Sequence, residues 1–151
     1  MPRTFTGVDA VVGAVGTQLG ETEWLEITQE QVNQFADATG DHQWIHVDVE
    51  RAVAGPYGGT IAHGYLTLSL IARFGGELFD VDGVSAKLNY GVNKVRFPTP
   101  VPVGARIRAG ASIAGAQETP AGVQISLQWV IELEGSTKPA CVAETVVLLV
   151  P

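Results

Sequence analysis

One carboxylate and two imidazoles lie close together in one short stretch of the chain, Gly40-Asp41-His42-Gln43-Trp44-Ile45-His46, and a second acid, Asp48, follows it. Asp41 and His46 are five residues apart, and a carboxylate and an imidazole that converge on one water can act as general acid and general base. Taken singly, such residues are usually a turn aspartate and a packed or exposed histidine. The stretch is therefore a candidate active site, and the elements that position it must be found in the surrounding sequence.

Capping signals lie on both sides of this stretch. Thr28 opens a capping box, so we expect a helix to begin after it, and Gly40 is placed to end that helix in a left-handed conformation. Asp48 is expected to cap a second, short helix over residues 49–53. Residues 41–47 are therefore expected to form a loop between two helices.

An apolar helix and several strands are expected around this loop. Tyr65 to Phe74 is apolar on nearly every face, which predicts a helix that is buried all round and ends at Gly75-Gly76. A change of apolar parity near Gly91 indicates a bulge in a strand. The strand candidates are residues 21–27, 84–97, 105–113, 123–133 and 142–150. The predicted fold class is α+β, with a single domain over residues 1–151 in which a curved antiparallel sheet wraps around a buried central helix.

Composition narrows the class of function. A net charge of −7 argues against a nucleic-acid partner, because phosphates favour basic surfaces. The single cysteine, Cys141, cannot form an intramolecular disulfide, and no stretch approaches the length of a transmembrane span. We therefore expect a cytoplasmic metabolic protein with no membrane partner.

All three histidines of the chain, His42, His46 and His63, lie in or near the candidate site. The spacing of His42 and His46 would suit a metal ion only on a continuous helix, and Gly40 argues against one. We therefore expect no metal, with His42 exposed. His63 is expected to anchor the turn before the apolar helix, next to the substrate.

Three segments in order, residues 35–46, 62–66 and 96–104, resemble the MaoC-like hydratases, the (R)-specific enoyl-CoA hydratases of the hot-dog fold. The family pattern runs Gly-Asp, a variable residue, Asn-Pro, an aliphatic residue and His. The chain matches it except that Gln43 and Trp44 replace Asn and Pro. In this departure it also resembles the nodulation-protein-like branch of the superfamily.

The resemblance implies an activity and a site. It implies reversible addition of water to trans-2-enoyl-CoA to give (R)-3-hydroxyacyl-CoA, without a cofactor, in a homodimer with sites near the interface. Asp41 and His46 would lie on either side of the reacting water. Gly64, at the start of the apolar helix, would present free N–H groups to the thioester oxygen. Gln43 is expected to contact the substrate, and Trp44 is expected to limit its length.

A cluster of cations suggests where coenzyme A would bind. Five of the nine cations fall within residues 87–108, and no acid occurs between residues 83 and 117. This stretch is a candidate binding surface for the phosphates, with Lys94 and Arg106 as contacts. Cations on strand edges also discourage aggregation, so both interpretations stay open.

Two other functions remain open from the sequence. An acyl-CoA thioesterase would need an attacking water beside the thioester carbon, and the Asp41 to His46 spacing resembles hydratases more. A non-catalytic acyl-CoA-binding protein is favoured by Gln43 and Trp44, which depart from the hydratase pattern. An assay for hydration of crotonyl-CoA distinguishes these functions, because only the hydratase would consume the enoyl group.

Overall fold

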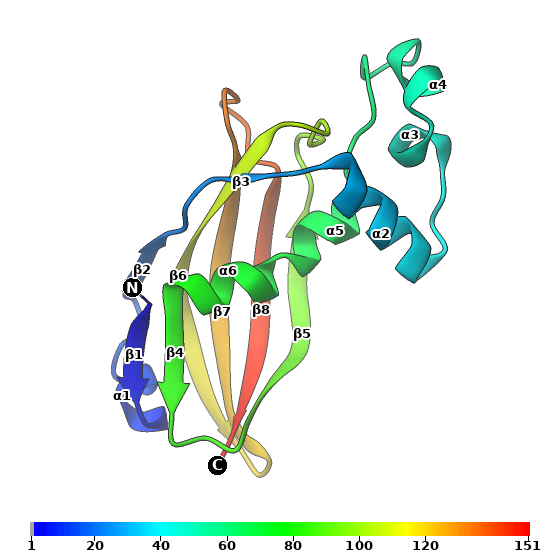
Figure 1. Ribbon diagram of the computed structural model, residues 1–151. Helices are drawn as coiled ribbons and strands as arrows, with labels where there is room; N and C mark the ends of the chain where they lie inside the picture. Colours follow the sequence, from blue (N-terminus) through cyan, green and yellow to red (C-terminus); the bar gives the residue numbers. More distant parts are fainter. Residues whose placement is uncertain (1) are drawn as a thin grey trace.

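A computed structural model describes residues 2–151 and contains a six-stranded sheet with a helix lying across one face (Figure 1). The elements in chain order are β1 Arg3–Thr6, α1 Val8–Val12, β2 Gln18–Glu21, β3 Leu25–Glu26, α2 Gln29–Thr39, α3 Trp44–Val47, α4 Val49–Val53, α5 Gly64–Ser69, α6 Ile71–Leu78, β4 Phe79–Asp82, β5 Ala86–Arg96, β6 Arg106–Thr119, β7 Gly122–Leu133 and β8 Cys141–Val150. This is the α+β arrangement expected from the sequence.

The long strands form an antiparallel sheet in the order β2-β6-β7-β8-β5, with β3 pairing with the start of β6. Alternate residues of β6 and β7 face the helix and are almost fully buried, as the sequence alternation predicts. These residues are Ile107, Ala109, Ala111, Ile113, Ile125, Leu127, Trp129 and Ile131. The predicted strands 105–113, 123–133 and 142–150 are confirmed, and β6 extends further than predicted.

The central helix is longer than predicted. A turn at Leu70 separates α5 from α6, but the hydrogen bonds continue from Leu70 N to Leu66 O (3.0 Å) and from Phe74 N to Leu70 O (2.9 Å). The prediction that the helix ends at Gly75-Gly76 is wrong, because it runs on to Leu78. Each helical glycine costs about 1 kcal/mol, whereas burying Phe74 and Leu78 stabilises the helix by about 1.5–3 kcal/mol each.

The prediction that this helix is buried all round is also wrong for the described chain. Leu66, Leu70 and Phe74 form a buried stripe, but Tyr65 is 72% exposed and Arg73 is also exposed. One side of the helix therefore has no cover from the described residues. No helix in residues 2–151 is long and apolar enough to cross a membrane.

The bulge expected near Gly91 is confirmed. The register of β5 against β8 shifts between Asn89 and Gly91 and again between Val92 and Lys94. β5 is the last strand of the sheet, so one of its edges has no partner strand in the described chain. Several of its apolar side chains are left open by the rest of the described chain, with Leu88 50% exposed and Tyr90 63% exposed.

The N-terminal region holds elements that the sequence does not predict. β1 pairs in parallel with β4, and α1 packs beside them, although residues 8–20 show no periodicity. The single strand predicted over 21–27 is two short strands, β2 and β3. Thr22 interrupts the ladder, because its Oγ1 accepts the hydrogen bond from Ala109 N (3.0 Å).

Cys141 provides a test of the packed sheet. Its thiol is fully buried, and burial raises its pKa to about 11. A pKa raised in the folded state favours folding below the pKa of the unfolded thiol, and this contribution is lost as the pH rises through the folded value. We expect an aromatic disulfide reagent at pH 8 to label the native protein far more slowly than the denatured protein. Equal rates would contradict this packing.

Candidate active site

Three short helices, α2, α3 and α4, form a lobe next to the start of α5 (Figure 1). The caps predicted from the sequence are confirmed. Thr28 Oγ1 accepts a hydrogen bond from Gln31 N (3.2 Å), and Asp48 Oδ1 accepts one from Arg51 N (3.1 Å). Gly40 ends α2 in the left-handed region with φ 79°, a conformation that side chains other than glycine rarely adopt. The candidate stretch is therefore anchored at both ends.

The stretch between these caps is not the simple loop that the sequence predicts. Residues 44–47 form one helical turn, α3, in which Asp48 N donates to Trp44 O (3.1 Å). This turn carries His46 inward, where it is only 6% exposed. Asp41 precedes the turn, and its side chain is 51% exposed. The site thus combines a buried imidazole with a carboxylate open to solvent.

His46 is held at its ring and at its backbone. Its Nδ1 lies 2.7 Å from the carbonyl oxygen of Ile61, which can only accept, so Nδ1 carries the proton and Nε2 has a free lone pair. Gln29 Nε2 donates to the carbonyl of His46 (2.8 Å), and Thr60 Oγ1 donates to Gln29 Oε1 (2.6 Å). The orientation of His46 therefore depends on residues 15 and 17 positions away in sequence.

His63 contacts both members of the predicted pair. Its Nε2 donates to the backbone oxygen of Asp41 (2.9 Å) and lies 4.0 Å from Asp41 Oδ2. Its ring stacks on His46 with centroids 3.8 Å apart and an interplanar angle of 22°, and Phe35 packs on it at 4.9 Å. His63 is only 3% exposed, and its Nδ1 has no hydrogen-bond partner in residues 2–151. The structure brings Asp41 and His46 together through this third residue.

Asp41, His46 and His63 are also the residues that a metal ion would use. One possible ligand atom from each lies within 4.8 Å of the others. An imidazole lone pair lies in the plane of its ring, and two nearly parallel stacked rings cannot direct such lone pairs at one ion. The arrangement of these side chains therefore suits acid–base chemistry better than metal binding.

Gly64 is the first residue of α5, directly after His63. The N–H groups of Leu66 and Thr67 return to the carbonyl of His63, so those of Gly64 and Tyr65 precede the first helical hydrogen bonds. A Cβ at position 64 would lie 3.1 Å from the ring of Phe97. Packing of Phe97 is thus one physical reason for a glycine at this position.

Gln43 and Trp44 lie on the outer side of the lobe. Gln43 is exposed and caps α3. The guanidinium of Arg51 lies 4.3 Å from the centre of the Trp44 ring, and a Cβ on Gly55 would lie 3.0 Å from that ring. Trp44 therefore packs between α3 and α4, and it does not line the large cavity beside α6.

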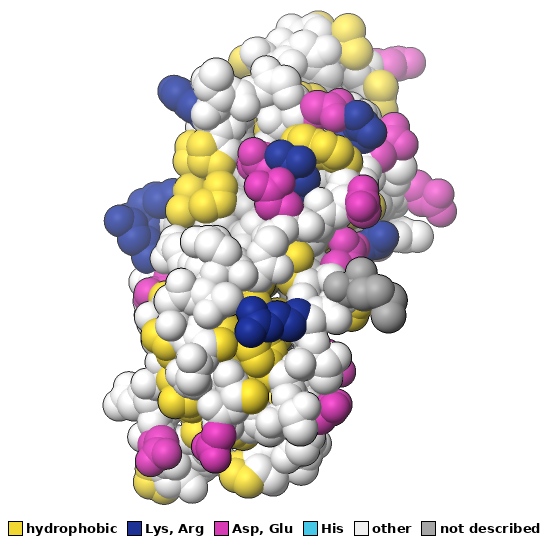
Figure 2. Space-filling view, turned by 90° about the vertical axis from the view of Figure 1, so that its left-hand side faces the viewer, with side chains coloured by type: hydrophobic (Ala, Val, Ile, Leu, Met, Phe, Trp, Pro, Cys, Tyr) yellow, Lys and Arg dark blue, Asp and Glu magenta, His cyan; other side chains and the backbone are white. Residues whose placement is uncertain are grey.

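The cations between residues 87 and 108 do not form a continuous basic surface. Lys87 pairs with Asp80, Arg106 with Glu134, and Arg108 with Glu132 and Glu21. Figure 2 shows dark blue and magenta side chains next to one another over the upper half of the visible face. The interpretation of this stretch as a phosphate-binding strip is therefore weakened by acids from neighbouring strands.

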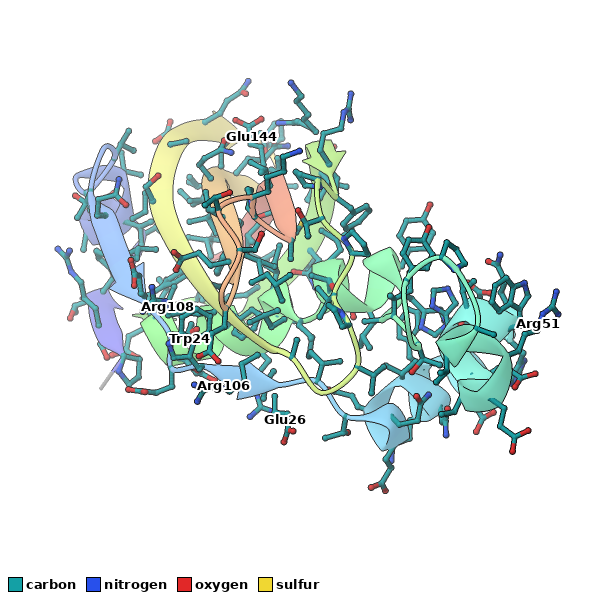
Figure 3. All side chains as sticks on the ribbon, turned by 90° about the horizontal axis from the view of Figure 1, so that it is seen from above. Trp24, Glu26, Arg51, Arg106, Arg108 and Glu144 are labelled. Carbon is teal, nitrogen blue, oxygen red and sulfur yellow. The ribbon has the colours of Figure 1, made fainter. Side chains whose placement is uncertain are left out.

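Lys94 and Arg106 occupy different parts of the sheet. Lys94 faces Glu144 across the β5–β8 ladder and lines a cavity of about 310 Å³ with Arg96. Arg106 lies on β6, and Figure 3 places it far from Arg51 of α4, which belongs to the lobe with the candidate site. The structure does not bring Arg106 to that site.

His42 is exposed, as predicted. Its Nε2 lies 2.9 Å from Asp37 Oδ1, and this hydrogen bond raises the pKa of His42. Gln29, Thr60 and Ile61 were not predicted as part of the site. No local pattern marks them, because their partners lie 15 to 31 residues away in sequence.

Comparisons with known proteins agree with this fold. Residues 10–126 match the family described as MaoC like domain. The chain is 56% identical over 146 residues to 3-hydroxyacyl-thioester dehydratase Z of Mycobacterium tuberculosis, covering 96% of this chain and 97% of the relative. It is 40% identical over 143 residues to nodulation protein N of Rhizobium leguminosarum, covering 92% and 88%. The structure of the (R)-hydratase from A. caviae superposes with a TM-score of 0.74 at 24% identity, covering 89% and 96%.

The sheet, the central helix and the flanking lobe define a protein of the hot-dog fold. Within that fold, the chain belongs to the MaoC-like dehydratase family. Both the expected family and its relation to the nodulation proteins are confirmed.

His63 can be tested as the residue that aligns the pair. His63→Phe keeps the stacked ring but loses the N–H that reaches Asp41, whereas His63→Gln places an amide N–H near the position of Nε2. We expect kcat for an enoyl thioester to fall by about tenfold to a hundredfold in His63→Phe, because small misplacements of reacting groups have such effects. His63→Gln should recover part of kcat, with KM little changed in either variant.

Thermal melting of both His63 variants serves as the control. Equal losses of kcat in the two variants, in parallel with equal losses of stability, would show that His63 supports folding alone.

Proposed function

We propose that the protein is a hydro-lyase, a 3-hydroxyacyl-thioester dehydratase that also adds water to trans-2-enoyl thioesters to give (R)-3-hydroxyacyl thioesters. The observation that carries the proposal is the free Nε2 of the buried His46 beside the carboxylate of Asp41. The 56% identity to a 3-hydroxyacyl-thioester dehydratase over nearly the whole chain supports it.

The geometry supports a single water as the reactant. His46 Nε2 accepts a proton from a water that Asp41 also orients, and the water oxygen forms the bond to C3. The pair returns one proton to C2, so that one molecule of water is added across the double bond. Because Ile61 fixes the proton on Nδ1, the free lone pair of His46 always points away from that carbonyl.

Charge builds on the thioester oxygen during this step. The free N–H groups of Gly64 and Tyr65 at the start of α5 are the donors proposed to stabilise it. One such donor is worth on the order of 3 kcal/mol in a site that excludes water.

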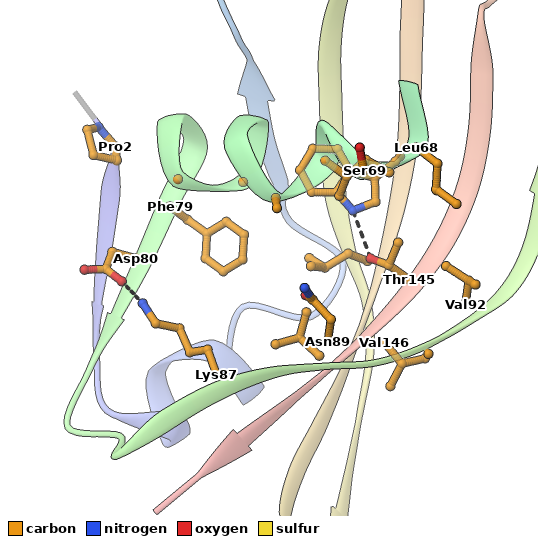
Figure 4. A pocket seen from close by; sticks show the side chains of 18 residues that line it. Pro2, Leu68, Ser69, Phe79, Asp80, Lys87, Asn89, Val92, Thr145 and Val146 are labelled. Atoms are coloured by element: carbon orange, nitrogen blue, oxygen red, sulfur yellow. Dashed lines mark hydrogen bonds and ion pairs between the residues drawn. The ribbon is translucent and has the colours of Figure 1, made fainter. Parts of the chain in front are cut away.

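The acyl group has a place beside the central helix. A cavity of about 680 Å³ lies between α5–α6 and strands β5, β7 and β8, and it begins at Leu68, one turn after Gly64 (Figure 4). On its far wall Trp129 Nε1 donates to Thr145 Oγ1 (3.0 Å), so the polar N–H of the indole is satisfied within the protein. We assign this cavity to the acyl chain.

The alternatives are less well supported. A thioesterase needs its water at the thioester carbon, whereas the 56% identity to a 3-hydroxyacyl-thioester dehydratase favours a water at C3. A non-catalytic binder is favoured by Gln43 and Trp44, but Trp44 packs on Arg51 and Gly55 and leaves Asp41 and His46 together.

Three further parts belong to the proposal. Lys94 is proposed to contact the phosphates of coenzyme A. Arg106 is not, because Glu134 binds its guanidinium. A cytoplasmic location is supported by Cys141, which is a buried free thiol. Residues 1–151 are proposed to form one domain.

Disappearance of the enoyl absorbance of crotonyl-CoA measures the activity directly. We expect Asp41→Asn and His46→Gln each to lower kcat by about a hundredfold to ten-thousandfold, the usual contribution of a positioned acid or base. His42→Gln is the matched control and should keep full activity, because His42 is exposed and pairs only with Asp37. Activity that survives both substitutions would reject this site, and wild-type inactivity on short and long enoyl chains would favour the binder.

We also propose a homodimer that joins two sheets along β5. The free edge of β5 offers unpaired backbone groups, and such edges are normally covered or charged. Apolar side chains surround this edge, with Tyr90 63% exposed and Tyr65 72% exposed on the neighbouring helix. An exposed apolar surface of this kind is typical of a protein interface.

A charge on β5 tests the dimer. Tyr90→Glu should shift the protein toward the monomer in light scattering at micromolar concentration, because the carboxylate would be desolvated at the interface. Val130→Glu is the control, since Val130 is similarly apolar and 42% exposed but lies on β7 inside the sheet. A Tyr90→Glu variant that keeps the wild-type mass would contradict this interface.

A further inference from the structure

The walls of the 680 Å³ cavity differ in chemistry. The strands β6 and β7 turn buried apolar side chains toward the helix, from Ile107 to Ile113 and from Ile125 to Leu133, and Leu127 and Trp129 line the cavity. β5 contributes a more polar wall. It lines the cavity with Lys87, Asn89 and Gly91 besides the apolar Val92, while Leu88 and Tyr90 lie on its outer side.

One polar side chain on this wall, that of the solvent-exposed Asn89, has no protein partner among the described residues. Among residues 2–151, the side-chain hydrogen bonds of β5 involve Lys87, Asn93 and Arg96, and none involves Asn89. In Figure 4 the amide of Asn89 points into the space between β5 and the helix. Across the cavity Trp129 Nε1 donates to Thr145 Oγ1, so the indole N–H is already occupied.

The end of the cavity beyond Asn89 is also polar. Lys87 and Asp80 form an ion pair there, next to Phe79 (Figure 4). The pair has no net charge, and the amide of Asn89 both donates and accepts hydrogen bonds. The ammonium of Lys87 holds the pKa of Asp80 below its usual value, so the pair stays charged and closed at neutral pH.

We propose that the acyl groups this enzyme prefers carry an uncharged oxygen, a hydroxyl or a ketone, on the tail, where it hydrogen-bonds to Asn89 beside the Lys87–Asp80 pair. This inference rests on the proposed function, because it describes the substrate of the same site. A plain alkyl tail would leave the amide of Asn89 unsatisfied against hydrocarbon. A tail carboxylate would meet Asp80 as well as Lys87, so the neutral pair disfavours it.

The tail must be long to reach this point. The helix residues that line the cavity run from Leu68 to Gly76, which spans roughly 12 Å at the rise of an α-helix. A crotonyl group ends near Asp41 and His46 and does not reach Asn89. In the proposed dimer the open edge of β5 is covered, which would exclude water from Asn89 and increase its need for a partner.

Competing substrates provide the test. The wild-type protein is assayed with crotonyl-CoA, with trans-2-dodecenoyl-CoA and with dodecenoyl-CoA that carries a hydroxyl at successive positions of the tail. We expect kcat/KM for the best hydroxylated substrate to exceed that of the plain chain by about tenfold, the effect of one satisfied hydrogen bond. Asn89→Leu should abolish this preference and leave crotonyl-CoA hydration unchanged.

Asn93→Leu is the matched control, because Asn93 lies on the same strand but binds Glu144 outside the cavity. It should keep the wild-type preference. A wild-type protein that hydrates plain and hydroxylated chains equally, or an Asn89→Leu variant that still discriminates, would overturn the inference while leaving the proposed function intact. A ω-carboxyl chain preferred over every hydroxylated one would also overturn it. Failure on crotonyl-CoA and dodecenoyl-CoA alike would remove the proposed function and this inference together.

Discussion

The stacked imidazoles of His46 and His63 are the contact on which the rest of the site depends. Each ring donates one N–H to a backbone oxygen in the other ring's segment: His46 to Ile61, and His63 to Asp41. The two segments therefore bind each other twice, and the stack at 3.8 Å sets the distance between them. One consequence is that Asp41, although half exposed, is fixed through its backbone relative to the buried His46.

The sheet supports this contact through the segment that carries His63. Ala62 N donates to Val101 O (2.8 Å) and Val103 N donates to Thr60 O (2.9 Å), which ties the segment to the chain that leads from β5 to β6. The same segment continues into the central helix, whose buried stripe packs on β6 and β7. The packing energy of the core thus also determines where the free N–H groups of α5 point.

Strand β5 combines two properties that ordinary amphipathic strands keep apart. Its outer side carries the exposed Leu88 and Tyr90, whereas Lys87 and Asn89 share its inner side with Val92, so polar groups stand where a strand that covers a core is apolar. The proposed second subunit would cover the apolar outer side, and the proposed substrate would contact the polar groups of the inner side. In an isolated chain the apolar outer side of β5 would face water.

Much of this architecture follows from local patterns in the sequence. Thr28, Gly40 and Asp48 determine the helix ends around the site, because a cap is a hydrogen bond or a backbone conformation that involves only two to four neighbouring residues. Strand alternation in β6 and β7 is equally local, since it depends only on which face is buried. The family pattern added the identity of Asp41 and His46.

Tertiary structure alone decided the remainder. The hydrogen bond between Thr60 and Gln29 joins residues 31 positions apart. The ion pair with Glu134 neutralises Arg106, a cation that has no acidic neighbour in the sequence. The helix runs through Gly75-Gly76 because Phe74 and Leu78 are buried together, which no local propensity records. The sequence by itself thus determined most of the central elements and the proposed reacting pair, where the forces act between near neighbours. The packed chain determined their orientation, their partners and the shape of the cavity, because these depend on groups that meet only after folding.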